Sequence, residues 1–335
     1  MQKAPISVVL LNWNGENFLD KFLPSIIKYS DPELADIVVV DNASTDNSIK
    51  IIKKYKTVKI VQLDKNYGFT GGYNKGLEHI HSKYFLLLNT DVEVTENWLE
   101  PMYDLMEKNP NIAACGPKLL DFYKRNKFEY AGAAGGFLDK YGYPFCRGRI
   151  FNTLEEDMGQ YDSNIDCLWV SGAAFMIRSD LFFYAGKFDD NFFAHQEEVD
   201  LCWRLKNLGY DIVFEPKSVV YHVGGGTLHK SNPRKTFLNF RNNLFIIWKN
   251  VPKTTRRKIL FVRIFMDGVA SIKMLLSFEF FDFLAVYAAY YAFWKKRRNI
   301  KGMNRRIALK YQKGIYHKSI VFSYFLKKKK YFTEL

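Results

Sequence analysis

The first ninety residues alternate between short apolar runs and segments with helical spacing. Four apolar runs are typical of strands buried on both faces of a sheet: Ile6–Leu11, Asp36–Val40, Val58–Leu63 and Tyr84–Leu88. Three segments with helical spacing lie between them: Phe18–Tyr29, Asp46–Tyr55 and Gly71–His81. Because buried strands that alternate with helices are typical of a parallel sheet covered on both faces, the pattern predicts an α/β fold with a mostly parallel central sheet.

The pattern weakens after this region and then returns. Residues 115–165 are rich in Gly and Tyr, which indicates loops and short antiparallel strands. Regular elements are predicted again further along the chain: a strand over Cys167–Arg178, a helix over Glu197–Asn207 that ends at Gly209, and strands near Asp211–Phe214 and Val219–Tyr221. We therefore expect residues 1–229 to divide into a first half over about 1–114 and a second half over about 115–229.

The charge pattern separates a second region, residues 230–335. The chain of 335 residues has a net charge of +14, but from Lys230 onward 25 Lys and Arg face only 4 Asp and Glu. This region is aromatic and helical in period, and its longest uncharged stretch, Phe283–Trp294, is too short for the roughly 20 residues that a membrane-spanning helix needs. Amphipathic helices lying on an anionic membrane surface are expected, with a helical cap on the soluble domain as the alternative.

The cysteines and the N-terminus favour an intracellular protein. The four cysteines show no paired metal-ligand spacing and do not suggest a disulfide framework. The apolar run near the N-terminus lacks a small-residue cleavage site, so no signal peptide is expected. We expect a cytoplasmic protein that is peripheral at the inner face of the cell membrane.

Polar residues follow three of the predicted strands directly, as Asn12-Trp13-Asn14, Asp41-Asn42 and Asn89-Thr90-Asp91. In open parallel sheets ligands bind beyond the carboxyl ends of the strands, so these residues indicate one site. A carboxylate there suits Mg²⁺ or Mn²⁺, although Asp91 could equally cap a turn. Ser44 or Thr45 is expected to cap the next helix, whereas Asp41 is placed to read a base or a ribose.

Acidic residues and a histidine in the second half are further candidates. Glu197, Glu198 and Asp200 begin a predicted helix; they suit a general base, and the helix terminus alone also favours one or two of them. Arg204 lies four residues after Asp200 and is expected to pair with it, which favours a structural role for that acid. His222 ends a predicted strand and could complete a metal site with Asp91, although a lone histidine is more often structural.

The glycine-rich stretch "NYGFTGGYNKG" begins a predicted helix and could approach a phosphate. It lacks the GxGxxG order and follows the third strand, which disfavours a nicotinamide dehydrogenase.

Seven motifs in order resemble the inverting family 2 glycosyltransferases of GT-A fold, near their rhamnosyltransferase-like members. They are "VVLLNWNG", "VVVDNASTDNS", "NYGFTGGYNKG", "LLLNTDVEV", "WVSGAAFMIRSD", "GKFDDNFFAHQEEVDLCWRLKNLGY" and "VVYHVGGGT", and the resemblance covers about residues 1–245. It implies a Rossmann-like sheet with a small antiparallel part, to which the C-terminal amphipathic helices are added.

The resemblance also implies that the GT-A domain, 1–229, has a nucleotide-binding half over about 1–114 and an acceptor half over about 115–229, and it implies roles for individual residues. The nucleotide and donor set is Asn12, Asn14, Asp41, Asn42, Gly71, Gly72, Asn74, Asn89, Thr90, Asp91 and Arg241. The acceptor side is Trp169, Ser171, Gly172 and Asp200. Asp91 and His222 would bind Mg²⁺ or Mn²⁺, and Asn89 departs from the first Asp that is usual in the metal motif. Glu198 matches the usual base, although Glu197 could take the proton instead.

The resemblance implies metal-dependent transfer of a sugar, with inversion, from a nucleoside-diphosphate sugar to a hydroxyl of a lipid-linked or growing bacterial surface glycan. The first expectation for the donor is dTDP-rhamnose, followed by a UDP-hexose or UDP-galactofuranose. Two other classes stay open, a nucleotidyltransferase and a non-catalytic sugar-nucleotide-binding scaffold. Asn12–Glu16, where a triphosphate loop would be basic, disfavours the first. The expected partners exclude nucleic acid and include a possible second copy of the chain.

Overall fold

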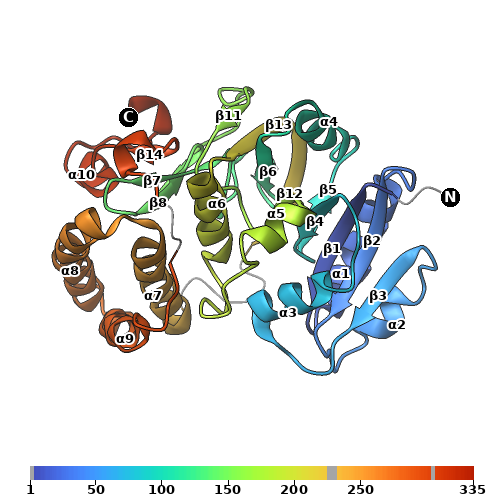
Figure 1. The fold of residues 1–335 in the computed structure, drawn as a ribbon, viewed down its shortest axis with the longest axis horizontal. Helices are drawn as coiled ribbons and strands as arrows, with labels where there is room; N and C mark the ends of the chain where they lie inside the picture. The colour runs from blue at the N-terminus through green and yellow to red at the C-terminus, as the bar shows by residue number, and fades with distance from the viewer. Residues whose placement is uncertain (1–3, 225–231, 303–305) are drawn as a thin grey trace.

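The computed structural model describes residues 4–224, 232–302 and 306–335. Within them, nine strands form a central sheet, eight of them in the order β11-β13-β6-β12-β4-β1-β2-β3, with β5 paired to β13 (Figure 1). Their bounds are β1 Ile6–Asn12, β2 Ala35–Asp41, β3 Val58–Gln62, β4 Tyr84–Leu88, β5 Val92–Val94, β6 Ile112–Asp121, β11 Ile165–Asp166, β12 Ala174–Arg178 and β13 Asp211–His222. Every predicted strand of the first ninety residues is therefore present.

The central sheet is mostly parallel, as expected. Strands β4, β1, β2 and β3 pair in parallel, and β13 runs parallel to β6. Strand β12 lies antiparallel between β4 and β6, and Ala174 at its start pairs with Leu88 at the end of β4. The segment that leads into β12 therefore reaches the same edge as the carboxyl ends of the parallel strands.

The predicted strand over Cys167–Arg178 is wrong in its first half, since only Ala174–Arg178 belongs to β12. Cys167–Val170 is buried, but a single bridge joins Trp169 to Gly136 and no ladder forms. An apolar run can thus be buried in the core without lying in a strand. The two strands predicted near 211–221 form one strand, β13, with an irregularity between Glu215 and Val219.

Helices cover both faces of this sheet, and each face has its own core. Helices α1 Glu16–Lys28 and α4 Glu100–Lys108 pack on one face, with the short helix α2 Ser48–Ile52 beside α1. Helices α3 Gly68–Leu77, α5 Ser179–Tyr184 and α6 Glu197–Leu208 pack on the other. The sheet is apolar on both faces for this reason, and only its edges are free to hold polar groups.

A smaller sheet contains segments that are far apart in the sequence. Its order is β10-β9-β8-β7-β14, with bounds β7 Gly136–Asp139, β8 Pro144–Cys146, β9 Arg149–Ile150, β10 Thr153–Leu154 and β14 Ile315–Tyr316. The short helix α10, Ile320–Phe325, packs on it through Ile320 and Tyr324. Two 3₁₀ turns, Leu309–Tyr311 and Phe332–Glu334, complete this end.

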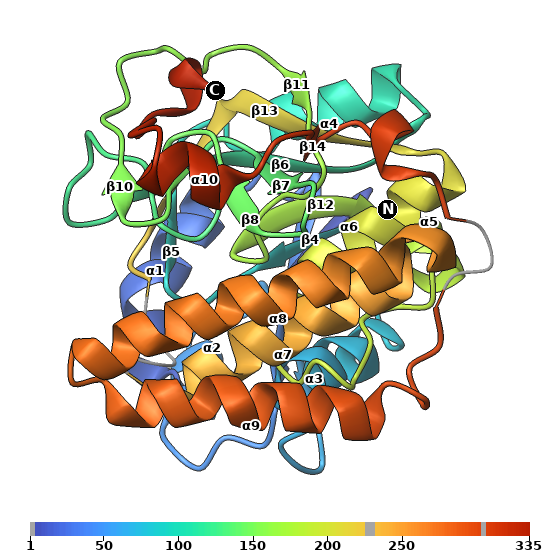
Figure 2. The ribbon, with the colours of Figure 1, turned by 90° about the vertical axis from the view of Figure 1, so that its left-hand side faces the viewer.

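Three long helices form a layer on one side of the molecule: α7 Pro233–Asn250, α8 Lys253–Leu276 and α9 Phe280–Lys296. Figure 2 shows α8 and α9 side by side along this surface, with α7 beneath them. No helix in the described part of the chain is long and apolar enough to cross a membrane. The expected boundary between residues 229 and 230 lies outside the described residues.

A buried polar cluster fixes α8 in this layer. Arg263 forms an ion pair with Asp267 one turn later, with Nη2 3.1 Å from Oδ2. The hydroxyls of Tyr143 and Tyr290 donate to the same carboxylate, at 2.5 and 2.7 Å. The smaller sheet, α8 and α9 thus meet at one satisfied charge pair, which is the condition under which a buried ion pair is tolerated.

Candidate functional site

The ends of β1 and β2 form the first corner of the candidate site. The buried Asn12 donates from Nδ2 to Asp41 Oδ1 at 3.1 Å and to Ser44 Oγ at 3.0 Å. The backbone N–H of Ser44 donates to Asp41 Oδ2 at 3.0 Å. Asn14 lies at the rim in a left-handed conformation and accepts a hydrogen bond from the backbone of Thr45. These residues meet at the edge of the sheet, as the sequence predicts.

Ser44 takes a role that the sequence did not predict. Neither Ser44 nor Thr45 caps α2, whose preceding residue is Asn47. The Ser44 hydroxyl instead accepts hydrogen bonds from the Asn12 amide group and from the backbone N–H of Asn14. The expected helix cap is wrong because α2 begins at Ser48, two residues later than predicted, which leaves the Ser44 hydroxyl free to bond to Asn12 and Asn14.

Helix α3 is packed tightly onto this corner through Asn42 and Gly72. Asn42 donates to Asn66 Oδ1 and to the carbonyl of Gly68, both at 3.0 Å, and so fixes the approach to the helix. A Cβ at Gly72 would lie 2.8 Å from Leu11 and 3.0 Å from the Asn42 amide nitrogen, so only glycine allows this packing. At Gly71 a Cβ would lie 3.0 Å from Tyr67.

Asn74 ties α3 to the second half of the chain. Its Nδ2 donates to the carbonyl of Phe188 and to Asp190 Oδ1, both at 2.9 Å, and its Oδ1 accepts from the backbone N–H of Phe188. These contacts give Asn74 a structural task, while its expected contact with the donor stays a prediction.

Asp91 and His222 meet as the sequence predicts, although they are far apart along the chain. His222 ends β13 opposite Val92, and its Nε2 lies 3.1 Å from Asp91 Oδ1. The Nδ1 of His222 lies 3.4 Å from Glu129 Oε1. Burial favours neutral His222, but the charge of Glu129 and the contact with Asp91 outweigh burial and raise its pKa to about 10.

The donor atoms of Asp91 and His222 suit a divalent cation that substrate oxygens help to coordinate. No group of three or more His, Cys, Asp or Glu in the described chain could hold a metal alone. One carboxylate and one imidazole fit Mg²⁺ or Mn²⁺ when phosphate oxygens complete the coordination. Glu129 faces the second nitrogen of His222, as carboxylates commonly do behind a metal-ligating histidine.

Glu129 is a site residue that sequence reasoning missed. It is buried, it follows β6, and its backbone N–H donates to the carbonyl of Leu119. It lies in the Gly- and Tyr-rich region, where no periodic pattern singles it out. Only the pairing of β6 with β13 brings it next to His222.

Glu197 and Glu198 begin α6, and they differ in exposure. Glu197 is almost fully buried, whereas Glu198 is partly exposed, and each has one buried oxygen without a hydrogen-bond partner. Burial raises the pKa of Glu198 to about 7 against the opposing effect of backbone N–H groups. Burial and the neighbouring Glu198 hold the pKa of Glu197 well above its usual range. The pair therefore offers two carboxyl groups whose pKa values are raised, that of Glu198 to about 7.

The loop before these acids is strained. Phe193, His195 and Gln196 all have φ values in the left-handed region, between 67° and 69°. Residues other than glycine rarely adopt this backbone conformation. Asn242 on α7 holds the loop, since its Nδ2 lies 3.1, 2.8 and 2.7 Å from the carbonyl oxygens of Phe192, Ala194 and His195. Such strain persists only where surrounding contacts impose it.

Arg241 supports the same loop. Its Nη2 donates to the carbonyls of Asn191 and Phe192, and its Nε and Nη2 both donate to Asn242 Oδ1. Burial lowers the pKa of Arg241 to about 10. These contacts assign it a structural task at the start of α6, while its expected contact with the donor stays a prediction.

Asp200 does not line the site, which corrects its place in the expected acceptor set. Its side chain has no exposed surface, and Arg204, Lys249 and Asn250 all donate to it. The expected pairing with Arg204 is confirmed at 2.8 Å. Burial would raise the pKa of Asp200, but Lys249 and Arg204 outweigh it and lower that pKa. Asp200 joins α6 to α7.

The remaining acceptor-side residues lie in and beneath the segment that enters β12. Gly172 is in contact with Glu198, since a Cβ there would lie 3.5 Å from its carboxyl carbon. Trp169 is buried against Gly136 and donates to the carbonyl of Phe137 at 3.1 Å. Ser171 is also buried, and its hydroxyl accepts from the backbone of Ala173. Of these three residues, Gly172 alone touches a candidate catalytic group.

Two contacts join the three parts of the site. The backbone N–H of Asn89 donates to the carbonyl of Ala173, which places the metal motif beside the Gly172 turn. The hydroxyl of Tyr73 donates to the carbonyl of Leu88. Burial, together with the charges of Glu197 and Asp91, raises the pKa of Tyr73. The Thr90 hydroxyl lies near Gly15, which is also in contact with Asn12.

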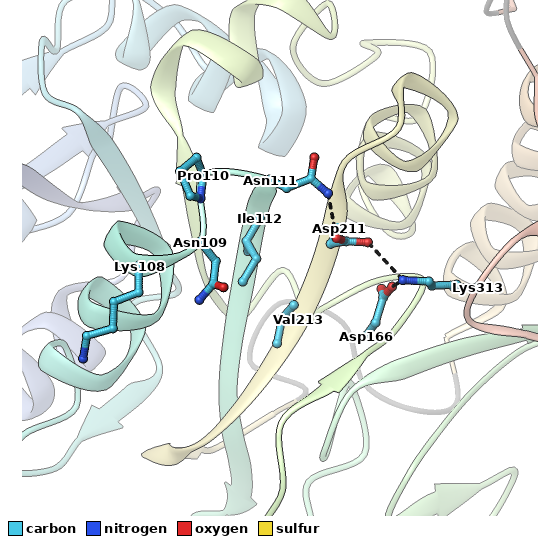
Figure 3. A pocket seen from close by; sticks show the side chains of 9 residues that line it. All are labelled: Lys108, Asn109, Pro110, Asn111, Ile112, Asp166, Asp211, Val213 and Lys313. Carbon is cyan, nitrogen blue, oxygen red and sulfur yellow. Dashed lines mark hydrogen bonds and ion pairs between the residues drawn. The ribbon is translucent and has the colours of Figure 1, made fainter.

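A pocket of about 330 Å³ lies at the opposite edge of the sheet, where β6 and β13 begin. Its polar groups satisfy one another: Asn111 donates to Asp211 at 2.7 Å, and Lys313 pairs with Asp166 and Asp211 (Figure 3). It contains none of the candidate site residues, and its charges are balanced.

Comparisons with known proteins agree with this architecture. The family model "Glycosyl transferase family 2" matches residues 7–182. N-acetylgalactosaminyltransferase 6 of Drosophila melanogaster is 24% identical over 240 residues, 69% of this chain and 36% of the relative. N-acetylglucosaminyl-diphospho-decaprenol L-rhamnosyltransferase of Mycobacterium tuberculosis is 23% identical over 233 residues, 65% of this chain and 75% of the relative.

A solved structure shares the fold. GalNAc-T7, crystallised with UDP, GalNAc and Mn²⁺, superposes with a TM-score of 0.59 at 18% identity, over 75% of this chain and 49% of that one. The chain thus spans about a third of the Drosophila relative and half of GalNAc-T7. The expected GT-A fold is confirmed. Because the family model matches more than half of its residues, the chain belongs to glycosyltransferase family 2.

Proposed function

We propose that this protein transfers a sugar, with inversion, from a nucleoside-diphosphate sugar to an acceptor hydroxyl, and that Glu198 is the general base. One observation carries the assignment of the base. Glu198 is partly exposed, it has an oxygen without a partner, and its pKa is raised to about 7. A base is most effective when its pKa lies near the working pH. Glu197 is buried and its pKa is held well above its usual range, which suits a supporting role.

The other residues would hold the donor. The ends of β1 and β2 offer hydrogen-bonding groups for the nucleoside, from Asn12, Asp41 and Ser44. The start of α3 lies beside them. Asp91 and His222 would hold Mg²⁺ or Mn²⁺, which neutralises negative charge on the leaving diphosphate. Glu129 would keep the His222 ring in position.

For the donor we propose dTDP-rhamnose first, because one relative is a rhamnosyltransferase. UDP sugars are the second candidates, because GalNAc-T7 was solved with UDP. For the acceptor we propose a lipid-linked bacterial glycan, because the name of the same rhamnosyltransferase specifies a diphospho-decaprenol substrate.

The exposed faces of α8 and α9 support a place at the membrane. Large apolar side chains recur along them at helical spacing: Phe261, Ile264, Phe265, Val269, Ile272, Leu276, Phe280, Phe281, Leu284, Tyr287, Tyr291 and Trp294. A continuous exposed face of this kind is typical of an interaction surface rather than of a solvated one. The excess of Lys and Arg in the same region favours an anionic bilayer, which at the inner face of the cell membrane would bring the enzyme to a lipid-linked acceptor.

A thermal-shift screen of nucleotide sugars with and without Mn²⁺ tests the proposed donor site. One donor should raise the melting temperature, and it should do so only when Mn²⁺ is present, since ligand binding stabilises the native state. The configuration of the product at the anomeric carbon, read by NMR, then tests inversion. A protein that no nucleotide sugar stabilises would instead be a scaffold, and a retained configuration would exclude the single displacement proposed here.

A further inference from the structure

A strongly basic pocket of about 410 Å³ lies where α7 and α9 end and α8 begins. Five cationic side chains line it: Lys253, Arg256, Arg297, Arg298 and Arg306. No Asp or Glu is among the residues that line it. The three helices meet at this end of the layer seen in Figure 2, and none of the candidate sugar-transfer residues lines the pocket.

The positive charge of this basic pocket is not balanced by any carboxylate in the part of the chain that the structure describes. Among the described residues, none of the five cations forms an ion pair, whereas Lys313 in the pocket of Figure 3 pairs with two carboxylates. Like charges held close together cost free energy unless an anion joins them. The two pockets are similar in size, and they differ in that the basic pocket lacks a counter-charge.

Arg256 is the most informative residue of the basic pocket. Only 9% of its surface is exposed, and its guanidinium carbon lies 3.6 Å from the centre of the Trp248 ring. Its Nη1 donates to the carbonyl of Trp248 at 2.7 Å, but its Nε is buried without a hydrogen-bond partner. Buried donors are almost always paired, so an unpaired one here indicates a missing acceptor.

The surroundings of Arg256 point to an anion as that acceptor. Burial, together with the charges of Arg306 and Arg257, lowers the pKa of Arg256. Arg306 is itself fixed, because its Nε donates to the carbonyl of Lys249 at 2.7 Å. The first turn of α8, a helix of 24 residues, adds the positive end of its dipole at Lys253. Arg256 and Arg306, whose positive charges repel each other, are therefore held in place by hydrogen bonds to backbone carbonyls.

We propose that this basic pocket binds a phosphate group. Arginine side chains recognise phosphate through paired N–H donors, and four of the five cations that line the pocket are arginines. The phosphate can be that of an anionic lipid headgroup or a free phosphate or diphosphate. A lipid is the expected source, because the pocket lies between helices whose outer faces carry the exposed apolar side chains. The proposal does not depend on the sugar-transfer reaction.

The test compares two double variants of the full-length protein with equal loss of charge. Lys253→Gln/Arg298→Gln removes two exposed cations of the pocket, and Arg257→Gln/Lys258→Gln removes two exposed cations of α8 that do not line it. In the first arm, calorimetry measures binding of inorganic phosphate and pyrophosphate. In the second arm, co-sedimentation measures binding to phosphatidylcholine vesicles with and without phosphatidylglycerol. The pocket variant should bind at least about tenfold more weakly, since the loss of even one charged hydrogen bond costs about that factor.

The two arms separate the sources of the phosphate. Loss in the vesicle arm alone identifies a lipid headgroup, and loss in the calorimetric arm alone identifies a free phosphate. Equal weakening by both double variants, or no effect of either, would overturn the proposal, because general attraction by the basic region would then explain the binding. Arg256→Gln, whose melting temperature shows whether it folds, should lose the same binding. Sugar transfer to a soluble acceptor should stay unchanged in every variant, which separates this result from the proposed function.

Discussion

Glu197 and Glu198 are chemically identical neighbours, and only their surroundings make their exposure and their pKa values differ. Glu197 is buried, and burial together with the charge of Glu198 holds its pKa well above its usual range, while Glu198 stays partly exposed beside Gly172. Two acids whose pKa values are moved apart by their surroundings are a recurring sign of acid and base roles. The structure thus supplies a physical reason to favour Glu198, which the sequence alone left open.

Glu198→Gln should lower kcat by about 10²–10⁴-fold, because a positioned general base contributes about that factor. Affinity for the donor should survive, since the substitution keeps the shape of the side chain and leaves the Asn12 and Asp91 contacts intact. Single-turnover kinetics and donor titration measure the two quantities. Glu197→Gln is the matched control, and a larger loss in that variant would move the base to Glu197.

The rate should also depend on pH in a defined direction. The base acts only when it is deprotonated, so kcat/KM should rise with pH and level off above the Glu198 pKa of about 7. Three titratable groups interact with its charge: Glu197, and the buried thiols of Cys146 and Cys202, whose pKa values burial raises. A pH profile of kcat/KM measures this rise. A flat profile across pH 6 to 8, with chemistry rate-limiting, would exclude Glu198 as the base.

At this scale, sequence reasoning works where a residue directly follows a recognisable strand. Asp41, Asp91 and His222 each lie at a strand end, and the apolar run before each residue indicates where it will emerge. Glu129 and Ser44 follow no such rule, because their partners are brought to them by pairing between distant segments. The buried ion pairs of Asp200 were only partly predictable, since Arg204 is one turn away but Lys249 belongs to another helix.

Among the elements, α7 holds the loop before α6 in place through hydrogen bonds. It supplies Asn242, which holds three successive parts of the strained loop, and Asn243, which lies 3.2 Å from Gln196 at the helix start. Although α7 lies beyond the family match, which ends at residue 182, it fixes the geometry of the candidate base. This makes Asn242 a positioning residue.

Asn242→Ala should lower kcat at least about tenfold while leaving donor affinity nearly unchanged, because small displacements of catalytic groups are costly. Asn250→Ala provides the control: this residue is equally buried on the same helix, but it bonds to Asp200 instead of the loop. Both variants should lower the melting temperature. Kinetics measured well below both melting temperatures separate the two roles, and equal loss of kcat in the two variants would show that Asn242 is only structural.

Whole elements were predicted best where their hydrophobic pattern is strong. The apolar runs of β1, β2, β3 and β4 indicate their strands closely, because a strand buried on both faces has to be apolar along its length. The same logic gave the wrong answer at Cys167–Val170, which is equally apolar but lies between the two sheets. The smaller sheet has strands of two to four residues, too short for a periodic signal.

At the scale of the whole molecule, α8 and α9 would set the orientation of the enzyme on a membrane. The Arg263–Asp267 pair fixes α8 to the smaller sheet, and its carboxylate also contacts Tyr290 on α9, so the exposed apolar faces are rigid with respect to the candidate site. A protein attached through these faces would hold its site at a constant height above the lipid. That arrangement suits an acceptor whose reactive end projects from the bilayer.

Phe265→Ser/Phe281→Ser should weaken binding to anionic vesicles at least about tenfold, because insertion of one aromatic side chain contributes about 1.5–3 kcal/mol. Both side chains are more than two-thirds exposed, so the melting temperature should not fall. Met158→Ser is the control, since Met158 is an exposed apolar residue far from these helices in sequence. Vesicle flotation measures the change. Undiminished flotation of the double variant would show that this surface has another partner.

The pairing of β14 with β7 has a consequence for how the chain is made. Ile315 lies beside Leu138, so the outer edge of β7 gains its neighbour only after the ribosome has added the whole of α7, α8 and α9. Until then an unpaired strand edge is open to pairing with other nascent chains. Late closure over so long a stretch also slows folding, since contacts distant in sequence form slowly. We therefore expect newly synthesised chains to depend on chaperones until β14 is in place.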